Sequence, residues 1–151
     1  MRTVERDCVV ALIFSNDGKI LATRQAEKPR NVYPGLWAII AGGIDDGESH
    51  REALNREVLE EGGIDISKYP AEFIDAARDE AEETLQSGER VWCKMKFNTY
   101  KVTITGRNAD EIPVVLDEEH TEYAWVAPED LKSMQCNAPS VVLFRKLGYQ
   151  M

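Results

Sequence analysis

Three glutamates close together in this chain have the chemistry and spacing needed to hold a metal ion. Glu57, Glu60 and Glu61 stand at positions i, i+3 and i+4, so a helix presents their carboxylates on one face. These carboxylates repel one another, and a cation such as Mg²⁺ or Mn²⁺, which prefers oxygen ligands, relieves that repulsion. Mg²⁺ often shares its coordination with substrate phosphates, so an incomplete protein ligand set suits a phosphate-processing site. The alternative for such a fragment alone is a solvated acidic helix face.

The residues at both ends of this segment predict where its helix begins and ends. Ser49, followed three residues later by Glu52, is a capping-box pattern, which places the helix start near residue 50. Gly62 and Gly63 supply the stop, because glycine readily adopts the left-handed conformation that ends many helices. The three glutamates are therefore expected in the last two turns of a short helix.

The residues before this helix predict a strand and a tight loop. Residues 36–40 (LWAII) are expected to form a short strand, and residues 41–47 (AGGIDDG) a glycine-rich loop that can approach a metal or a phosphate closely. Arg56 is expected to pair with a carboxylate and to fix the junction between loop and helix. The alternative for Arg56 is an ordinary i, i+4 pair with Glu52.

Residues 42–64 (GGIDDGESHREALNREVLEEGGI) resemble the signature of the Nudix hydrolases, G-x5-E-x7-R-E-U-x-E-E-x-G-U, in which U is a bulky aliphatic residue. Residues 33–37 (YPGLW) are also similar to a run that precedes many such signatures, although Ala41 replaces a more usual proline. The resemblance implies an α/β Nudix fold, with a mixed curved β-sheet sandwiched between α-helices, over a single domain of residues 1–151. It also implies catalytic roles for Glu48, Arg56 and Glu61, and metal ligands at Gly42, Glu57, Glu60, Glu61 and Glu119.

Within this set, either Glu61 or Glu48 is expected to take a proton from the attacking water, and the sequence does not distinguish the two. Glu119 is assigned to the metal because it lies in an acidic run and stands six residues before Trp125, a spacing similar to that in relatives. The alternative is a solvated acidic loop in which Glu118 or Glu122 is equally well placed. For the neighbouring His120, a general-base role competes with a surface or capping role.

Arg24 and Asn137 are the candidate substrate-binding residues. The amide of Asn137 can both donate to and accept from a purine edge. Its alternative role is to cap the helix expected over residues 140–147. A small anionic substrate needs only a few local basic groups, of which Arg24 is one candidate.

The resemblance implies hydrolysis of a nucleoside diphosphate linked to another moiety, with Mg²⁺ or Mn²⁺ as the cofactor. The compact length and the absence of an added domain resemble the antimutator type of this family, which implies a (deoxy)nucleoside triphosphate, including oxidised purines, cleaved to monophosphate and pyrophosphate. ADP-ribose or a nucleotide sugar is the alternative substrate, and a non-catalytic nucleotide sensor is the alternative class of protein.

Composition excludes several other classes of function. The chain has 151 residues, of which 43% are apolar, and a formal charge of −9. So acidic a surface disfavours duplex nucleic acid, and no signal peptide or membrane-length apolar run is present. Three cysteines without metal-type spacing favour reduced, buried thiols. We therefore expect a cytoplasmic monomer or homodimer that acts on a small nucleotide.

The rest of the chain predicts further strands, a loop and helices. Strands are expected where apolar residues run together or alternate, and a helix is expected to open at Pro128. The predicted strands are 8–14, 20–23, 73–77, 90–104 and 123–126, with a loop at 27–34.

Overall fold

The first strand forms the centre of a mixed sheet. β1 (Arg2–Ser15) pairs in parallel with β6 (Arg90–Ile104) along one side. Along its other side it pairs antiparallel with β4 (Ile40–Gly43) and, at its end, with β2 (Ile20–Gln25). The computed structural model describes residues 1–28 and 31–151, so Pro29 and Arg30 of the predicted loop lie outside the described residues.

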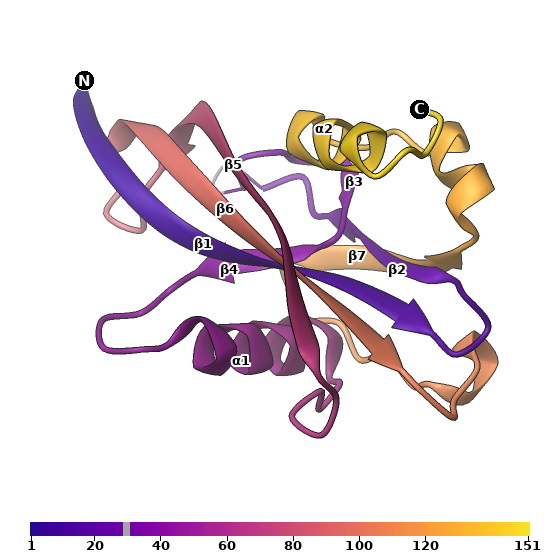
Figure 1. Ribbon diagram of the computed structural model, residues 1–151. Helices are drawn as coiled ribbons and strands as arrows, with labels where there is room; N and C mark the ends of the chain where they lie inside the picture. Colours follow the sequence, from indigo (N-terminus) through magenta and orange to yellow (C-terminus); the bar gives the residue numbers. More distant parts are fainter. Residues whose placement is uncertain (29–30) are drawn as a thin grey trace.

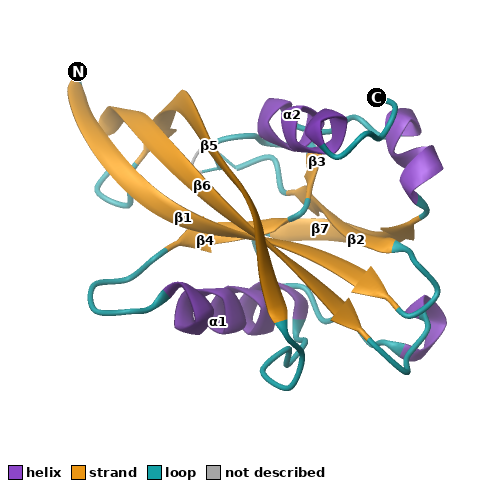
Figure 2. Ribbon diagram, in the orientation of Figure 1, coloured by secondary structure: helices purple, strands orange, loops and turns teal. Residues whose placement is uncertain are grey.

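Helices cover both faces of this sheet. In Figures 1 and 2, α1 (His50–Gly62) lies below the crossing strands and α2 (Ala138–Lys146) lies above them. This arrangement confirms the predicted α/β class, with a curved mixed sheet between helices. The remaining elements are β3 (Trp37–Ala38), β5 (Ala71–Thr84), β7 (His120–Val126) and two 3₁₀ helices, Ala109–Glu111 and Pro128–Ser133.

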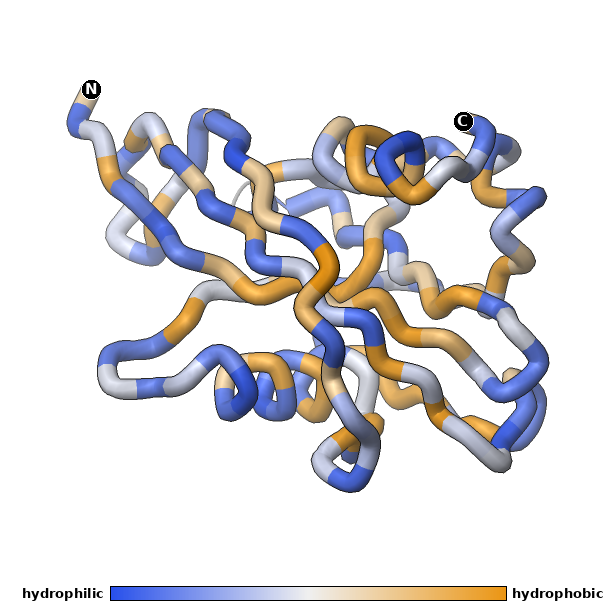
Figure 3. The backbone as a smooth tube through the Cα atoms, viewed as in Figure 1, coloured by the Kyte–Doolittle hydropathy of each residue, from blue (hydrophilic) through white to orange (hydrophobic). Residues whose placement is uncertain are grey.

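The continuous apolar run in β1 is explained by burial on both faces of the sheet. Alternate residues of a strand point to opposite faces. Val9, Ala11 and Ile13 pack on the α1 side, whereas Val10 and Leu12 pack on the α2 side. Figure 3 shows the apolar segments gathered where the strands cross between the two helices.

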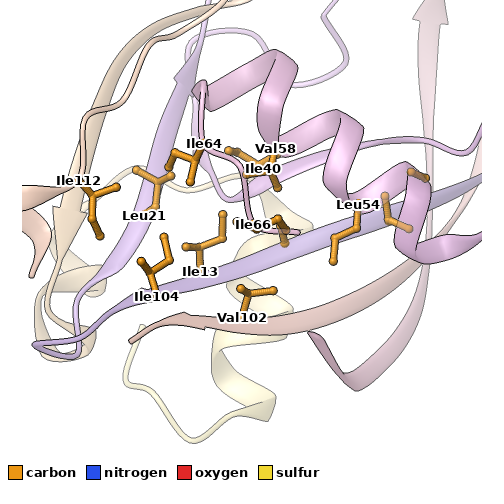
Figure 4. Packing of buried hydrophobic residues seen from close by; sticks show 13 residues of the cluster. Ile13, Leu21, Ile40, Leu54, Val58, Ile64, Ile66, Val102, Ile104 and Ile112 are labelled. Atoms are coloured by element: carbon orange, nitrogen blue, oxygen red, sulfur yellow. The ribbon is translucent and has the colours of Figure 1, made fainter. Parts of the chain in front are cut away.

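The helix α1 is fixed to the sheet by an apolar stripe at i, i+4 spacing. Leu54 and Val58 are almost fully buried, and they pack in one cluster with Ile40 and Ile64 (Figure 4). Burying a side chain of this size contributes about 1.5–3 kcal/mol. Because this stripe faces the core, the orientation of the neighbouring glutamates is set by packing.

The two ends of α1 lie where the sequence predicts them. Ser49 accepts a hydrogen bond from the backbone N–H of Glu52, and the Glu52 carboxylate accepts one from the N–H of Ser49. At the other end Gly63 has φ 68°, and its N–H donates to the carbonyl of Leu59. The predicted capping box and glycine stop are both confirmed.

Replacing Ser49 by alanine should destabilise the protein by about 1 kcal/mol, because a helical N–H then loses its acceptor. For a chain of this size the melting temperature should fall by about 2–4 °C, measurable by calorimetry. Ser49→Asp is the matched control, since aspartate caps helices equally well and should leave the melting temperature nearly unchanged. Equal melting temperatures for the alanine variant and the wild type would contradict this role for the cap.

Several predicted elements differ from the structure in their bounds, two of them most clearly. The single strand expected over residues 36–40 is wrong: the chain forms two short strands there, β3 paired with β2 and β4 paired with β1. The backbone changes pairing partner at this point, which alternation of side chains cannot indicate. The strand expected at 73–77 is part of the longer β5, which pairs with β6 to the end of the hairpin and carries a bulge between Phe73 and Asp75.

The described residues include no helix that is both long enough and apolar enough to cross a membrane. Cys8 and Cys93 are buried thiols, as predicted, and Cys136 is half-buried. Burial raises the pKa of the Cys8 thiol to about 11.

Candidate active site

The glycine-rich segment and α1 meet because β4 is pinned to β1. Gly42 pairs with Val9 and Gly43 with Cys8 in the antiparallel ladder. The chain then turns through residues 44–49 into α1. The end of β4 therefore lies against the carboxylate-bearing part of the helix.

Gly42 is required by the close approach of one of those carboxylates. A Cβ atom at this position would lie 2.1 Å from Cδ of Glu57, much closer than real contacts allow. Only glycine therefore lets the Glu57 carboxylate lie against the backbone of β4. The metal-ligand role of Gly42 stays a prediction.

Arg56 connects the loop to the helix, as expected. Its Nε and Nη2 donate to the two carboxylate oxygens of Glu48 at 2.7 and 2.8 Å, and Nη2 also donates to the carbonyl of Gly43 at 2.9 Å. Its Nη1 donates to Glu57 at 2.7 Å. The alternative pair with Glu52 is not formed, because Glu52 closes the capping box.

These contacts set the charges of the carboxylates. The hydrogen bond from Arg56 lowers the pKa of Glu48 to about 2, so this group stays ionised. Burial raises the pKa of Glu57 although Arg56 donates to it. Burial raises the pKa of Glu61 well above its usual value, and the charges of Glu57 and Asp117 raise it further.

Glu61 lies close to His120, the first residue of β7, and to Asp117 in the loop before it. Ligand atoms of Glu61, Asp117 and His120 all lie within 4.8 Å of one another. Nδ1 of His120 lies 2.7 Å from Oδ1 of Asp117, and only 6% of the His120 side chain is exposed. One carboxylate oxygen of Glu61, Oε2, is buried and has no hydrogen-bond partner among the described residues.

This donor set fits a divalent cation. Buried carboxylates with raised pKa values are costly when ionised, and a bound cation stabilises their charged form. Glu60 extends the set outward, since 57% of its side chain is exposed while it lies 3.3 Å from Arg56. Of the group around Glu61, His120 also lines the neighbouring cavity.

A cavity of about 230 Å³ opens beside this cluster, on the α2 face of the sheet. Its lining includes Gly42, which packs against Glu57, and His120, which lies in the group around Glu61. Tyr33 and Asp79, which are joined by a hydrogen bond between their side chains, line another part of it. Arg6, Arg78, Phe97, Met95, Asn137 and Ser140 are among the other lining residues.

Of the two predicted substrate-binding residues, Asn137 lines the cavity and Arg24 is not among its described lining residues. Asn137 caps α2, accepting from the N–H of Ser140 at 2.9 Å, and it also lines the cavity, so both roles considered for it are compatible. Arg24 is absent from the described lining of that cavity and pairs with Glu122 and the carbonyl of Gly35. The substrate-binding roles of both residues stay predictions.

Glu119 lines a second cavity together with Arg6 and Glu83. The member of the acidic run that lies with Glu61 is Asp117. Asp117 was not among the predicted site residues, and its one sequence signal is the i, i+3 spacing from His120. The metal-binding role of Glu119 stays a prediction.

The chain belongs to the Nudix family, since the model of the NUDIX domain matches residues 4–145. It is similar to the nucleoside triphosphatase NudI of Escherichia coli K12, at 33% identity over 143 residues that cover 93% of this chain and 95% of the relative. NudI of E. coli O17:K52:H18 matches with the same identity and coverage.

Solved structures agree on the fold. The MutT protein of Methanosarcina mazei Go1 superposes with a TM-score of 0.67 at 23% identity, covering 99% of each chain. The E. coli dihydroneopterin triphosphate pyrophosphohydrolase has a TM-score of 0.68 at 16% identity, over 95% of this chain and 96% of the other. The NUDIX domain of Shewanella oneidensis NrtR, complexed with ADP ribose, also has a TM-score of 0.68 at 16% identity, over 96% and 87%.

Proposed function

We propose that this Nudix pyrophosphohydrolase cleaves (deoxy)nucleoside triphosphates, including oxidised purine forms, to the monophosphate and pyrophosphate, using Mg²⁺ or Mn²⁺. The observation that carries the proposal is the half-buried group of Glu61, Asp117 and His120, of which His120 lines a cavity. A divalent cation can be coordinated by such a group and by the phosphates of a bound substrate at the same time. A bound divalent cation would acidify water and neutralise charge on phosphate oxygens.

Each residue of the site has a distinct task in this proposal. Glu57, Glu60 and Glu61 hold the cation, and Gly42 leaves room for Glu57. Both oxygens of Glu48 already accept hydrogen bonds from Arg56, so this pair positions the loop and helix and does not take a proton. Oε2 of Glu61 is the buried oxygen left for the metal or for the proton of the attacking water.

The size of the cavity favours a compact substrate. At about 230 Å³ it is smaller than the roughly 300–1,000 Å³ of pockets that enclose drug-sized ligands. The name of the NudI relatives supports a nucleoside triphosphate, whereas the ADP-ribose complex of the NrtR domain keeps ADP-ribose cleavage, a nucleotide sugar and a sensor role as alternatives.

A panel of substrates separates these possibilities. With Mg²⁺ present, kcat/KM should be at least about tenfold higher for one or more nucleoside triphosphates than for ADP-ribose or a nucleotide sugar, a difference of about 1.4 kcal/mol in transition-state binding. Product formation should be followed by chromatography for all substrates at equal enzyme concentration. Faster turnover of ADP-ribose would transfer the assignment to the alternative, and tight binding without turnover of any nucleotide would indicate a sensor.

A further inference from the structure

The imidazole of His120 is held by a carboxylate, as is common for histidines that bind metals. Its Nδ1 is bonded to Oδ1 of Asp117 at 2.7 Å, which leaves Nε2 as the second ring nitrogen. Histidines that bind metals commonly direct one ring nitrogen to a carboxylate, which fixes the ring and strengthens the other nitrogen as a ligand. The ring is also almost completely buried, so its orientation is held by its surroundings.

Glu61 supplies an independent sign of a ligand at the same place. Its Oε2 is buried without a hydrogen-bond partner in the described part of the chain, and a buried carboxylate oxygen left in this way costs free energy. The backbone N–H of Ala41 bonds to the same carboxylate. Glu61 and His120 belong to one group of residues, with Asp117, whose ligand atoms lie within 4.8 Å of one another.

We propose that Glu61 and His120, with Asp117 holding the imidazole, form a mixed oxygen–nitrogen site for a divalent cation, and that the imidazole makes this site prefer Mn²⁺ to Mg²⁺. Mg²⁺ favours oxygen ligands and retains its water, whereas Mn²⁺ accepts both carboxylate and imidazole ligands and binds nitrogen more strongly. The inference rests on the proposed function only in placing the metal at the same carboxylates.

The chain offers a clean spectroscopic test, because it has only two histidines. The other, His50, lies at the start of α1, where Nδ1 is 2.7 Å from the hydroxyl of Tyr100, outside the group around Glu61. In His50→Gln, made without added histidines, any imidazole signal on bound Mn²⁺ must come from His120. Electron spin echo envelope modulation of one equivalent of Mn²⁺ should show coupling to an imidazole ¹⁴N in this variant and in the wild type.

The complementary variant is His120→Gln, with folding checked by circular dichroism. It should lose the ¹⁴N coupling, and its Mn²⁺ dissociation constant should rise by about 10- to 100-fold. Its Mg²⁺ dissociation constant, from competition, should rise less than about fivefold. A wild-type or His50→Gln protein that binds Mn²⁺ without ¹⁴N coupling overturns the inference, even if nucleotides are hydrolysed. Coupling that is present when no nucleotide is hydrolysed supports it and counts against the proposed function alone.

Discussion

Glu61→Gln is expected to lower kcat by about 10²–10⁴-fold while the protein stays folded. The substitution keeps the shape of the side chain but removes the charge that would hold a cation beside Asp117 and His120. Because burial and the neighbouring carboxylates already disfavour the ionised form of Glu61, removing its charge should leave the melting temperature unchanged or raise it. Rates at saturating Mg²⁺ and calorimetry provide the two measurements.

Glu52→Gln is the matched control on the same helix. Glutamine also serves in a capping box, and Glu52 lies outside the cluster around Glu61, so this variant should keep nearly full activity and stability. If Glu61→Gln is as active as the wild type, Glu61 neither holds the cation nor takes part in catalysis. A large loss of melting temperature in Glu61→Gln would point to a structural role for this carboxylate.

Arg56→Ala is expected to reduce both stability and activity. Its guanidinium bonds to Glu48, Glu57 and the carbonyl of Gly43, and its removal leaves Glu57 buried beside other acids without a positive partner. Losing one member of a buried ion pair costs about 3–5 kcal/mol, and because Arg56 is partly exposed we expect a loss of about 2–3 kcal/mol. The melting temperature should fall by about 5–10 °C.

A second substitution at Arg56 tests the geometry of its pair with Glu48, and a substitution at Arg145 serves as the control. Arg56→Lys keeps the charge but cannot bond both oxygens of Glu48 in parallel, so it should recover only part of the stability and activity. Arg145→Ala removes an exposed arginine from α2 and should change the melting temperature by less than about 2 °C. If Arg56→Lys equals the wild type, charge alone explains the role of Arg56.

The local features of the site were predictable because local sequence determines them. The capping box of Ser49 and Glu52, the glycine stop and the apolar pair Leu54 and Val58 act within a few residues of one another. They set the length and orientation of α1, and thereby the face that carries the glutamates.

The features that depend on distant parts of the chain were not predictable from local patterning, and the expected closeness of the acidic loop and of Gly42 to the helix glutamates came from the family resemblance alone. The approach of Asp117 and His120 to Glu61 depends on how β7 pairs with β2, far from α1 in sequence. The contact between Gly42 and Glu57 depends on the antiparallel pairing of β4 with β1. Hydrophobic patterning indicates which residues are buried, but not which strand lies beside which.

The most direct test of the metal-dependent pyrophosphohydrolase assignment is ³¹P NMR of a deoxynucleoside triphosphate incubated with the wild-type protein, with Mg²⁺ and with excess chelator. With Mg²⁺, the triphosphate signals should be replaced by equal amounts of deoxynucleoside monophosphate and pyrophosphate, and with chelator they should persist. Release of inorganic phosphate with a nucleoside diphosphate, or an equal rate in chelator, would contradict the account.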